Sequence, residues 1–415
     1  MSLNVLIAPS GFKESLSASE AAHHIAAGVQ RVMPTARLLR APLVDGGEGF
    51  TLALVEATGG YSFPVTVTGP VGQPVVAPVG FLGGTDEPTA LIEMAAAAGL
   101  SLVPRDQRDP TRTTSYGVGE LIRAALDAGA RRILLGCGDS GINDGGAGMA
   151  QALGVRLLDR HGAELPRGGA ALARLARIDT RQRDPRLARV VLDAAVNWHN
   201  LLLGPRGVAR VFAPQKGATP AQVAELETAL ENFASVILRD LGLVVGSQPG
   251  SGASGGLGAG FQALLGGQLH PRYDIITRYL DLDGLIEQAD LVLTAEGSLD
   301  AQTPWGKIPV EVARRAKRRG LPVIALAGTL GEGAAVNLEH GIDAYLSIQQ
   351  RPCSLEEAVQ QAGQLLTSTT ENAMRTLRMG LDLSPRVERS KTTDLVPYLA
   401  QQDTTRAEPG SRLVA

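Results

Sequence analysis

Apolar runs rich in valine, isoleucine and leucine alternate with segments of helical periodicity along most of this 415-residue chain. The strand-like runs span residues 4–9, 37–44, 131–138, 188–197, 289–297 and 321–328, and the helix-like segments span 17–34, 50–60, 115–129, 219–242 and 309–320. The first helix is well marked, because Ser17 and Glu20 suit a capping box and Pro34 would stop it. Such alternation is typical of parallel sheets covered by helices, so the sequence predicts an α/β fold.

The middle of the chain differs from its two ends. Residues 61–84 contain period-2 stretches separated by proline and glycine turns, which predict short antiparallel strands. The parallel pattern returns only late in the chain, so we predict one discontinuous domain with a second α/β domain inserted into it. We predict that residues 1–70 and 286–382 form the discontinuous domain and that residues 71–285 form the inserted domain. Residues 383–415 are predicted to be a poorly ordered polar tail.

Composition and charge exclude several classes of protein. The formal net charge of -3 argues against a dedicated nucleic-acid binder, which would carry a basic face. No stretch approaches 18 uncharged apolar residues, and the N-terminal segment lacks the basic start of a signal peptide, so we expect no membrane span and a cytoplasmic location. Neither Cys137 nor Cys353 belongs to a CxxC pair, and no Cys/His cluster has metal-ligand spacing, so we expect two reduced thiols.

Glycine-rich or charged loops carry the residues that could perform chemistry. Five follow predicted strands, at residues 9–15, 44–49, 138–148, 196–204 and 294–307, and two more lie at 214–218 and 249–260. In open α/β sheets ligands bind at the carboxyl ends of strands, so these loops would line one site. Their charged side chains are Lys13, Asp45, Glu48, Asp144, Lys216, Glu296, Asp300 and Lys307. Lysines and backbone N–H groups can bind phosphate oxygens, and carboxylates can bind Mg²⁺ or accept a hydroxyl proton. The set therefore indicates phosphoryl transfer.

Residues 249–260 contain the pattern GxGxxG at Gly250, Gly252 and Gly255. They do not follow an opening strand, so the pattern is weak evidence for a dinucleotide fold. A loop that cradles phosphate at a helix N-terminus is the simpler interpretation, and a purely structural glycine turn is the alternative. The chain has no Walker A motif, because Lys307 is followed by isoleucine where that motif has Ser or Thr, so any ATP would bind in another way.

Taken in order, these motifs resemble those of bacterial glycerate kinases. The matching segments are KESLSASEAA (13–22), VDGGEG (44–49), IEMAAAAGL (92–100), RDP (108–110), TSYGVGELI (114–122), NDGGAGM (143–149), PQKGA (214–218), ASGGLGAG (253–260) and EGSLDAQTPWGK (296–307). The resemblance is specific, because many separate motifs agree in order and spacing over roughly residues 4–380. It implies that the discontinuous domain is Rossmann-like and that the active site lies in the cleft between the two domains. It also implies that the substrates are ATP, together with Mg²⁺, and D-glycerate, and that the usual product is 2-phosphoglycerate.

Carried over position by position, the resemblance implies roles for individual residues. The expected catalytic residues are Asp45, Asp300 and Lys13, and Asp45 and Asp300 are also the expected metal ligands. The expected substrate-binding residues are Ser10, Glu48, Ser115, Asn143, Asp144, Asn197 and Lys216. The expected nucleotide-binding residues are Gly250, Gly252, Gly255, Gly256, Glu296 and Lys307.

Four loop positions depart from the family pattern. Ser10 and Asn197 stand where carboxylates are usual, Ser298 stands where arginine is usual, and Asp139 adds a carboxylate. An arginine guanidinium can donate two hydrogen bonds to one carboxylate or phosphate, and Ser298 cannot. We therefore expect either glycerate or a related small hydroxy-acid as the acceptor. Two alternatives stay open: the same fold with a changed reaction that needs no ATP, such as elimination, and a non-catalytic ligand-binding relative. We expect no nucleic-acid or membrane partner, and a homodimer is the candidate assembly.

Overall fold

The structure, a computed structural model, describes residues 3–12, 15–44 and 46–402, and only the backbone of residues 384–402. Two of the three expected catalytic residues, Lys13 and Asp45, lie outside the described residues.

A fully parallel five-stranded sheet brings the two ends of the chain together. Its strand order is β13-β12-β11-β1-β2. The strands are β1 (Asn4–Ile7), β2 (Arg37–Arg40), β11 (Leu291–Leu299), β12 (Val323–Leu330) and β13 (Ala344–Ser347). Val5 pairs directly with Leu291, so segments almost 300 residues apart are neighbours in this sheet.

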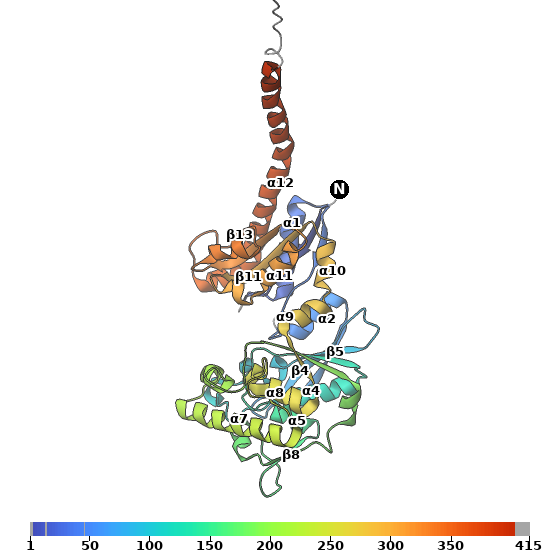
Figure 1. Cartoon of the computed structure of the whole chain (residues 1–415), viewed down its shortest axis with the longest axis vertical. Helices are drawn as coiled ribbons and strands as arrows, with labels where there is room; N and C mark the ends of the chain where they lie inside the picture. Colours follow the sequence, from blue (N-terminus) through green and yellow to red (C-terminus); the bar gives the residue numbers. More distant parts are fainter. Residues whose placement is uncertain (1–2, 13–14, 45, 403–415) are drawn as a thin grey trace, which may run out of the picture.

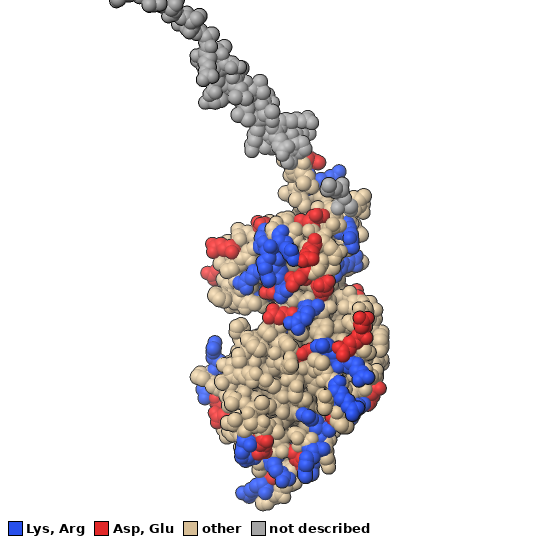
Figure 2. All heavy atoms as spheres, turned by 45° about the vertical axis from the view of Figure 1, so that its right-hand side comes forward, with Lys and Arg blue, Asp and Glu red and all other residues tan. Residues whose placement is uncertain are grey.

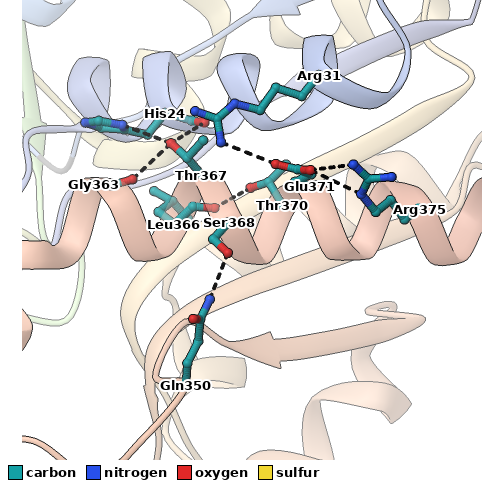
Figure 3. Close-up of polar contacts among 10 residues, drawn as sticks. All are labelled: His24, Arg31, Gln350, Gly363, Leu366, Thr367, Ser368, Thr370, Glu371 and Arg375. Carbon is teal, nitrogen blue, oxygen red and sulfur yellow. Dashed lines mark hydrogen bonds and ion pairs between the residues drawn. The ribbon is translucent and has the colours of Figure 1, made fainter.

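Helices cover both faces of this sheet. Helices α1 (Ala18–Val32) and α12 (Leu355–Gln402) pack on one face, and α11 (Ile308–Lys317) packs on the other. Figure 3 shows the contact between α1 and α12, where the Thr367 hydroxyl donates to the carbonyl oxygen of His24 at 3.2 Å and Arg31 pairs with Glu371 at 3.3 Å. The chain end after β13 is thereby held against the first helix.

A second, six-stranded sheet has the order β10-β9-β6-β5-β4-β3. Its strands are β3 (Tyr61–Thr68), β4 (Pro74–Phe81), β5 (Thr89–Glu93), β6 (Arg132–Gly136), β9 (Val191–Val196) and β10 (Gln268–Pro271). Strands β3, β4 and β5 pair antiparallel, as predicted for residues 61–84, and β5, β6, β9 and β10 pair parallel. The helices of this part are α3 (Ala95–Ala98), α4 (Tyr116–Asp127), α5 (Ala147–Ala152), α6 (Val208–Phe212), α7 (Pro220–Leu241) and α8 (Ala253–Leu265), and a short hairpin joins β7 (Arg156–Leu158) to β8 (Arg177–Asp179).

Short helices connect the two sheets. Figure 1 shows α2 (Phe50–Thr58) and α9 (Arg272–Tyr279) between them, with α10 (Leu282–Glu287) beside the five-stranded sheet. Phe50 and Ile275 belong to one buried apolar cluster that also contains Leu6 of β1 and Leu91 of β5. The core is therefore continuous from one sheet to the other.

The predicted α/β class is confirmed, and so is the capping box of α1. The Ser17 hydroxyl accepts a hydrogen bond from the Glu20 N–H at 3.2 Å, and the Glu20 carboxylate accepts one from the Ser17 N–H at 2.8 Å. Strand β3 belongs to the six-stranded sheet, whereas the predicted boundary at residue 70 groups it with the first domain. The division into two domains stays a prediction.

Helix α12 was not predicted. Its backbone is helical to Gln402, so it extends into the segment 383–415 for which the sequence predicts no regular structure. The sequence signal here is weak because the buried face of the helix is lined largely by small or hydroxylated residues such as Ala362 and Thr370. No helix in the described ranges is long and apolar enough to span a membrane.

Candidate active site between the two sheets

The segment between β2 and α2 links the carboxyl ends of the two sheets. The Leu43 N–H donates to the carbonyl oxygen of Pro9, just after β1, at 2.8 Å. Three residues later, a Cβ at Gly46 would lie 3.1 Å from the backbone nitrogen of Cys137, just after β6. Because three residues span at most roughly 11 Å, Pro9 and Cys137, which follow β1 and β6, are within roughly 17 Å of each other. In Figure 2 the surface is indented between the parts built on the two sheets.

Lys216 is a buried charge that contacts no carboxylate among the residues that the structure describes. It is 2% exposed, and its ammonium donates to Ser140 Oγ at 3.0 Å, to the Ile142 carbonyl at 2.6 Å and to Asn143 Oδ1 at 3.1 Å. Burial lowers the pKa of Lys216 to about 7, although the charge of Asp144 acts to raise it. A buried ammonium that contacts only neutral oxygens would be stabilised by an anionic ligand.

Asp144 fixes the glycine loop that carries Asn143. One carboxylate oxygen accepts bonds from the Ser115 N–H at 2.7 Å, the Ser115 hydroxyl at 2.8 Å and the Gly148 N–H at 3.3 Å, and the other accepts from the Gly146 N–H at 3.1 Å. Burial raises the pKa of Asp144, and these bonds oppose the rise. Both Asp144 and Ser115 therefore have structural partners, and their substrate-binding roles stay predictions.

Glu48 and Asp139 meet where the two sheets approach each other. The Glu48 N–H donates to Asp139 Oδ2 at 3.0 Å, and both residues are exposed. Asp139 has a positive φ of 46°, which is uncommon for a residue with a side chain. This contact places a predicted substrate-binding residue beside one of the four positions that depart from the family pattern.

Glu93 lies beneath this contact and was not among the predicted site residues. It ends β5, is 6% exposed, and accepts hydrogen bonds from the N–H groups of Thr51, at 3.3 Å, and Gly49 at the start of α2. Burial raises the pKa of Glu93 to about 7, and the charges of Glu48 and Asp139 add to the rise. The sequence signal that could have identified Glu93 as a site candidate was its position in the motif IEMAAAAGL (92–100).

Replacing Glu93 with glutamine should change how stability depends on pH. Because the folded-state pKa is raised from 4.5 to about 7, the stabilisation from the protonated carboxyl is present below pH 4.5 and lost as pH rises through 7. Between pH 5 and pH 8 the variant should gain up to about 3 kcal/mol relative to wild type in urea unfolding. Glu225→Gln, an exposed glutamate on α7, is the control; parallel pH profiles for all three proteins would contradict the account.

Asp300 and Lys307 form a second group, at the carboxyl end of β11. Lys307 Nζ lies 3.2 Å from Asp300 Oδ2 and donates to the Ser298 carbonyl at 3.0 Å, while the Gln302 N–H donates to Asp300 Oδ1 at 2.8 Å. Burial acts to raise the pKa of Asp300, but the Gln302 N–H and the Lys307 ammonium together lower it. Asp300 is therefore ionised at neutral pH and is a weak base.

The remaining predicted residues lie on the same sheet edges. The Ser10 hydroxyl is buried and donates to the Ala295 carbonyl at 3.0 Å, which joins β1 to β11. Glu296 lies inside β11, because this strand continues to Leu299 and does not end in a loop at residue 294 as predicted. Asn197 follows β9, and its side-chain oxygen accepts the His199 N–H at 3.1 Å.

The glycine loop at 249–260 packs directly on the Asn143 loop. It contains the predicted nucleotide-binding residues Gly250, Gly252, Gly255 and Gly256, all buried. Gly255 has a φ of 71°, its carbonyl accepts the Gly145 N–H at 3.0 Å, and a Cβ on it would lie 1.9 Å from the Ile142 carbonyl oxygen. The structural role of this loop is thus clear, and its nucleotide-binding role stays a prediction.

Six of the predicted site residues fall into two polar groups, apart from the contact between Glu48 and Asp139. Asn143, Asp144, Ser115 and Lys216 lie together in the part with the six-stranded sheet, and Asp300 and Lys307 lie together at the edge of the other sheet. Within the described ranges, no hydrogen bond or ion pair joins the two groups directly. A surface cavity of about 580 Å³ near Arg112, Arg167 and Arg174 contains none of the predicted site residues.

Comparison with known proteins finds similarity over nearly the whole chain. The pattern that defines the Glycerate kinase family matches residues 5–378. The chain belongs to the glycerate kinase family. A glycerate kinase from Halalkalibacterium halodurans is 47% identical over 368 residues, which are 89% of this chain and 96% of that protein. A glycerate 2-kinase from Escherichia coli is 44% identical over 379 residues, covering 91% and 99% of the two chains.

A solved structure from Salmonella typhimurium LT2, described as a glycerate kinase 2, has the same fold. It superposes with a TM-score of 0.81 and 46% sequence identity, and the match covers 92% of this chain and 100% of that one. The family match ends at residue 378, inside α12, so the last part of this helix lies beyond the glycerate kinase region.

Proposed function

We propose that this protein transfers the γ-phosphoryl group of ATP to a hydroxyl of D-glycerate and forms 2-phosphoglycerate and ADP. Membership of the glycerate kinase family and the names of relatives at 44–47% identity support this reaction. The structural observation that carries the proposal is the buried Lys216 ammonium, whose contacts in the described part of the chain are all neutral oxygens. A small anionic acceptor would complete this arrangement.

In this reaction the glycerate hydroxyl oxygen forms a bond to the γ-phosphorus of ATP while the bond from that phosphorus to the β–γ bridging oxygen breaks. The hydroxyl proton passes to a base, for which Asp45 remains the predicted residue. Lys307 and Lys216, which belong to two separate polar groups, would supply positive charge that favours a transition state with charge on the phosphoryl oxygens.

Mg²⁺ is the metal that we propose to accompany ATP. The described part of the chain has no group of three or more His, Cys, Asp or Glu side chains suited to a metal. Mg²⁺ is commonly held by one or two carboxylates together with substrate phosphates, so Asp300 and the predicted Asp45 suffice as protein ligands. When bound, Mg²⁺ would neutralise phosphate charge.

The direct test of the product is ³¹P NMR of the purified protein with Mg-ATP and D-glycerate. A new phosphomonoester signal matching 2-phosphoglycerate is expected, with stoichiometric ADP. A signal matching 3-phosphoglycerate would change the hydroxyl assigned, and the absence of any phosphoester with glycerate or related hydroxy-acids would refute the kinase assignment. The cytoplasmic location and the homodimer stay predictions from the sequence.

A further inference from the structure

Ser254 adopts a backbone conformation that is unfavourable for serine. Three successive residues in the first turn of α8 have left-handed geometry: Ser254, Gly255 and Gly256, with φ values of 51°, 71° and 87°. Glycine adopts this conformation readily, whereas a residue with a Cβ is strained in it. Strained residues of this kind persist where the surrounding structure fixes them, and they cluster at ligand sites.

The side chain of Ser254 is also poorly satisfied. The residue is 8% exposed, and its buried hydroxyl oxygen has no hydrogen bond of ordinary geometry within the described residues. It lies beside the Cys137 thiol, which is a weak partner. A buried hydroxyl without a strong partner is costly unless a ligand supplies one.

Asn143 presents a second buried donor of the same kind. It is fully buried, its Oδ1 accepts from Lys216, and its Nδ2 has no hydrogen-bond partner within the described residues. Because an ammonium can only donate, it fixes the orientation of this amide and leaves the NH₂ group available.

The Lys216 ammonium and the backbone next to Ser254 both approach one peptide segment. The Ile142 carbonyl accepts the Lys216 ammonium at 2.6 Å, and the same carbonyl oxygen lies 1.9 Å from the position of a Cβ on Gly255. That position is also 2.8 Å from Asn143 Cα. The left-handed turn and Lys216 therefore approach the segment Ile142–Asn143 closely.

We propose that Ser254, Asn143 and Lys216 form one buried oxyanion site. The Ser254 hydroxyl and the Asn143 NH₂ group can donate hydrogen bonds to an oxyanion, and Lys216, whose three N–H groups are already donated, adds positive charge. The neighbouring Asp144 carboxylate already accepts bonds through both of its oxygens. The oxyanion would be either the carboxylate of the hydroxy-acid or a phosphate oxygen of ATP. This choice of ligands rests on the proposed function; the site itself does not.

The test measures equilibrium binding of D-glycerate alone and of Mg-ATP alone by titration calorimetry. Ser254→Ala removes the hydroxyl and keeps the strain, whereas Ser254→Gly removes both. Each variant should weaken one of the two ligands by about tenfold or more, because a hydrogen bond to a charged group is lost. The matched control is Ser251→Ala, in the same loop: the Ser251 hydroxyl is buried but already donates to the Gln248 carbonyl at 2.7 Å, so both affinities should be unchanged.

The outcomes separate the site from the reaction. Weakened D-glycerate binding assigns the substrate carboxylate to this site, and weakened Mg-ATP binding assigns a phosphate. If both Ser254 variants keep both affinities within about twofold of wild type, the oxyanion site is refuted even when wild type phosphorylates glycerate. If wild type does not phosphorylate glycerate but a Ser254 variant loses affinity for Mg-ATP, the site stands and the proposed function falls.

Discussion

Replacing Lys216 with methionine is expected to lower kcat/KM for D-glycerate by about a hundredfold or more. Methionine retains the apolar length of the side chain but removes the buried ammonium, and losing one partner of a buried charge contact commonly has an effect of this size. Steady-state ADP release measures the change, and thermal unfolding checks that the variant is folded.

The control for this variant is Lys317→Met, at the end of α11. Lys317 pairs with Asp343 at 2.6 Å on the surface, at the opposite end of α11 from Lys307 and outside both polar groups. Its activity should equal that of wild type. A Lys216→Met protein that is folded and retains more than about a tenth of wild-type activity would contradict the role given to Lys216.

The same lysine predicts a pH dependence. Because burial lowers its pKa from 10.5 to about 7, the unfolded chain holds a proton between these values that the folded protein has released, so this group makes stability rise with pH across that window. Binding of an anion beside Lys216 requires the ammonium, so the affinity for whichever ligand occupies this position, D-glycerate or Mg-ATP, should fall as pH rises above 7. In Lys216→Met, neither the stability nor the ligand affinity should show this dependence on pH.

Replacing Gly255 with alanine should destabilise the protein by roughly 3 kcal/mol, measured as a lower urea midpoint. The new Cβ would lie 1.9 Å from the Ile142 carbonyl oxygen, so the backbone must move. The positive φ of 71° adds strain. Since Lys216 is bonded to that same carbonyl, activity should fall with stability.

Gly266→Ala isolates the effect of the close contact. Gly266 ends α8 with a φ of 81°, but no atom lies within 4 Å of its added Cβ. This control should lose only the roughly 1 kcal/mol expected for alanine in the left-handed region. Equal losses in the two variants would show that Gly255 is required for its backbone conformation alone.

Local signals predicted much of the fold. The capping box at Ser17 marked α1. The helix predicted over residues 219–242 is α7, and the structure shows that it begins at a capping box of Thr219 and ends at Gly242. Helix α12 escaped prediction because it is stabilised by its packing on α1 and not by a strong apolar stripe. The assignment of β3 to the six-stranded sheet depends on pairing with β4, which no local pattern specifies.

The sequence indicated candidate site residues by type but not how they are arranged. It predicted that Asn143 and Lys216 belong to one site, and the structure shows the two side chains in contact, while their roles stay predictions. Ser254 and Glu93 were missed because their chemistry arises from burial and backbone geometry. A serine in a glycine-rich loop looks ordinary until its φ of 51° and its buried hydroxyl are seen.

The central claim, that this chain is a kinase acting on glycerate, is tested most directly by ADP release from Mg-ATP by the purified protein, with and without D-glycerate. The account predicts ADP release that depends on D-glycerate, saturates with its concentration, and is low in its absence because the reaction needs an acceptor in the site. ADP release that is rapid without any acceptor, or that is unaffected by D-glycerate and by every related hydroxy-acid supplied, would contradict it.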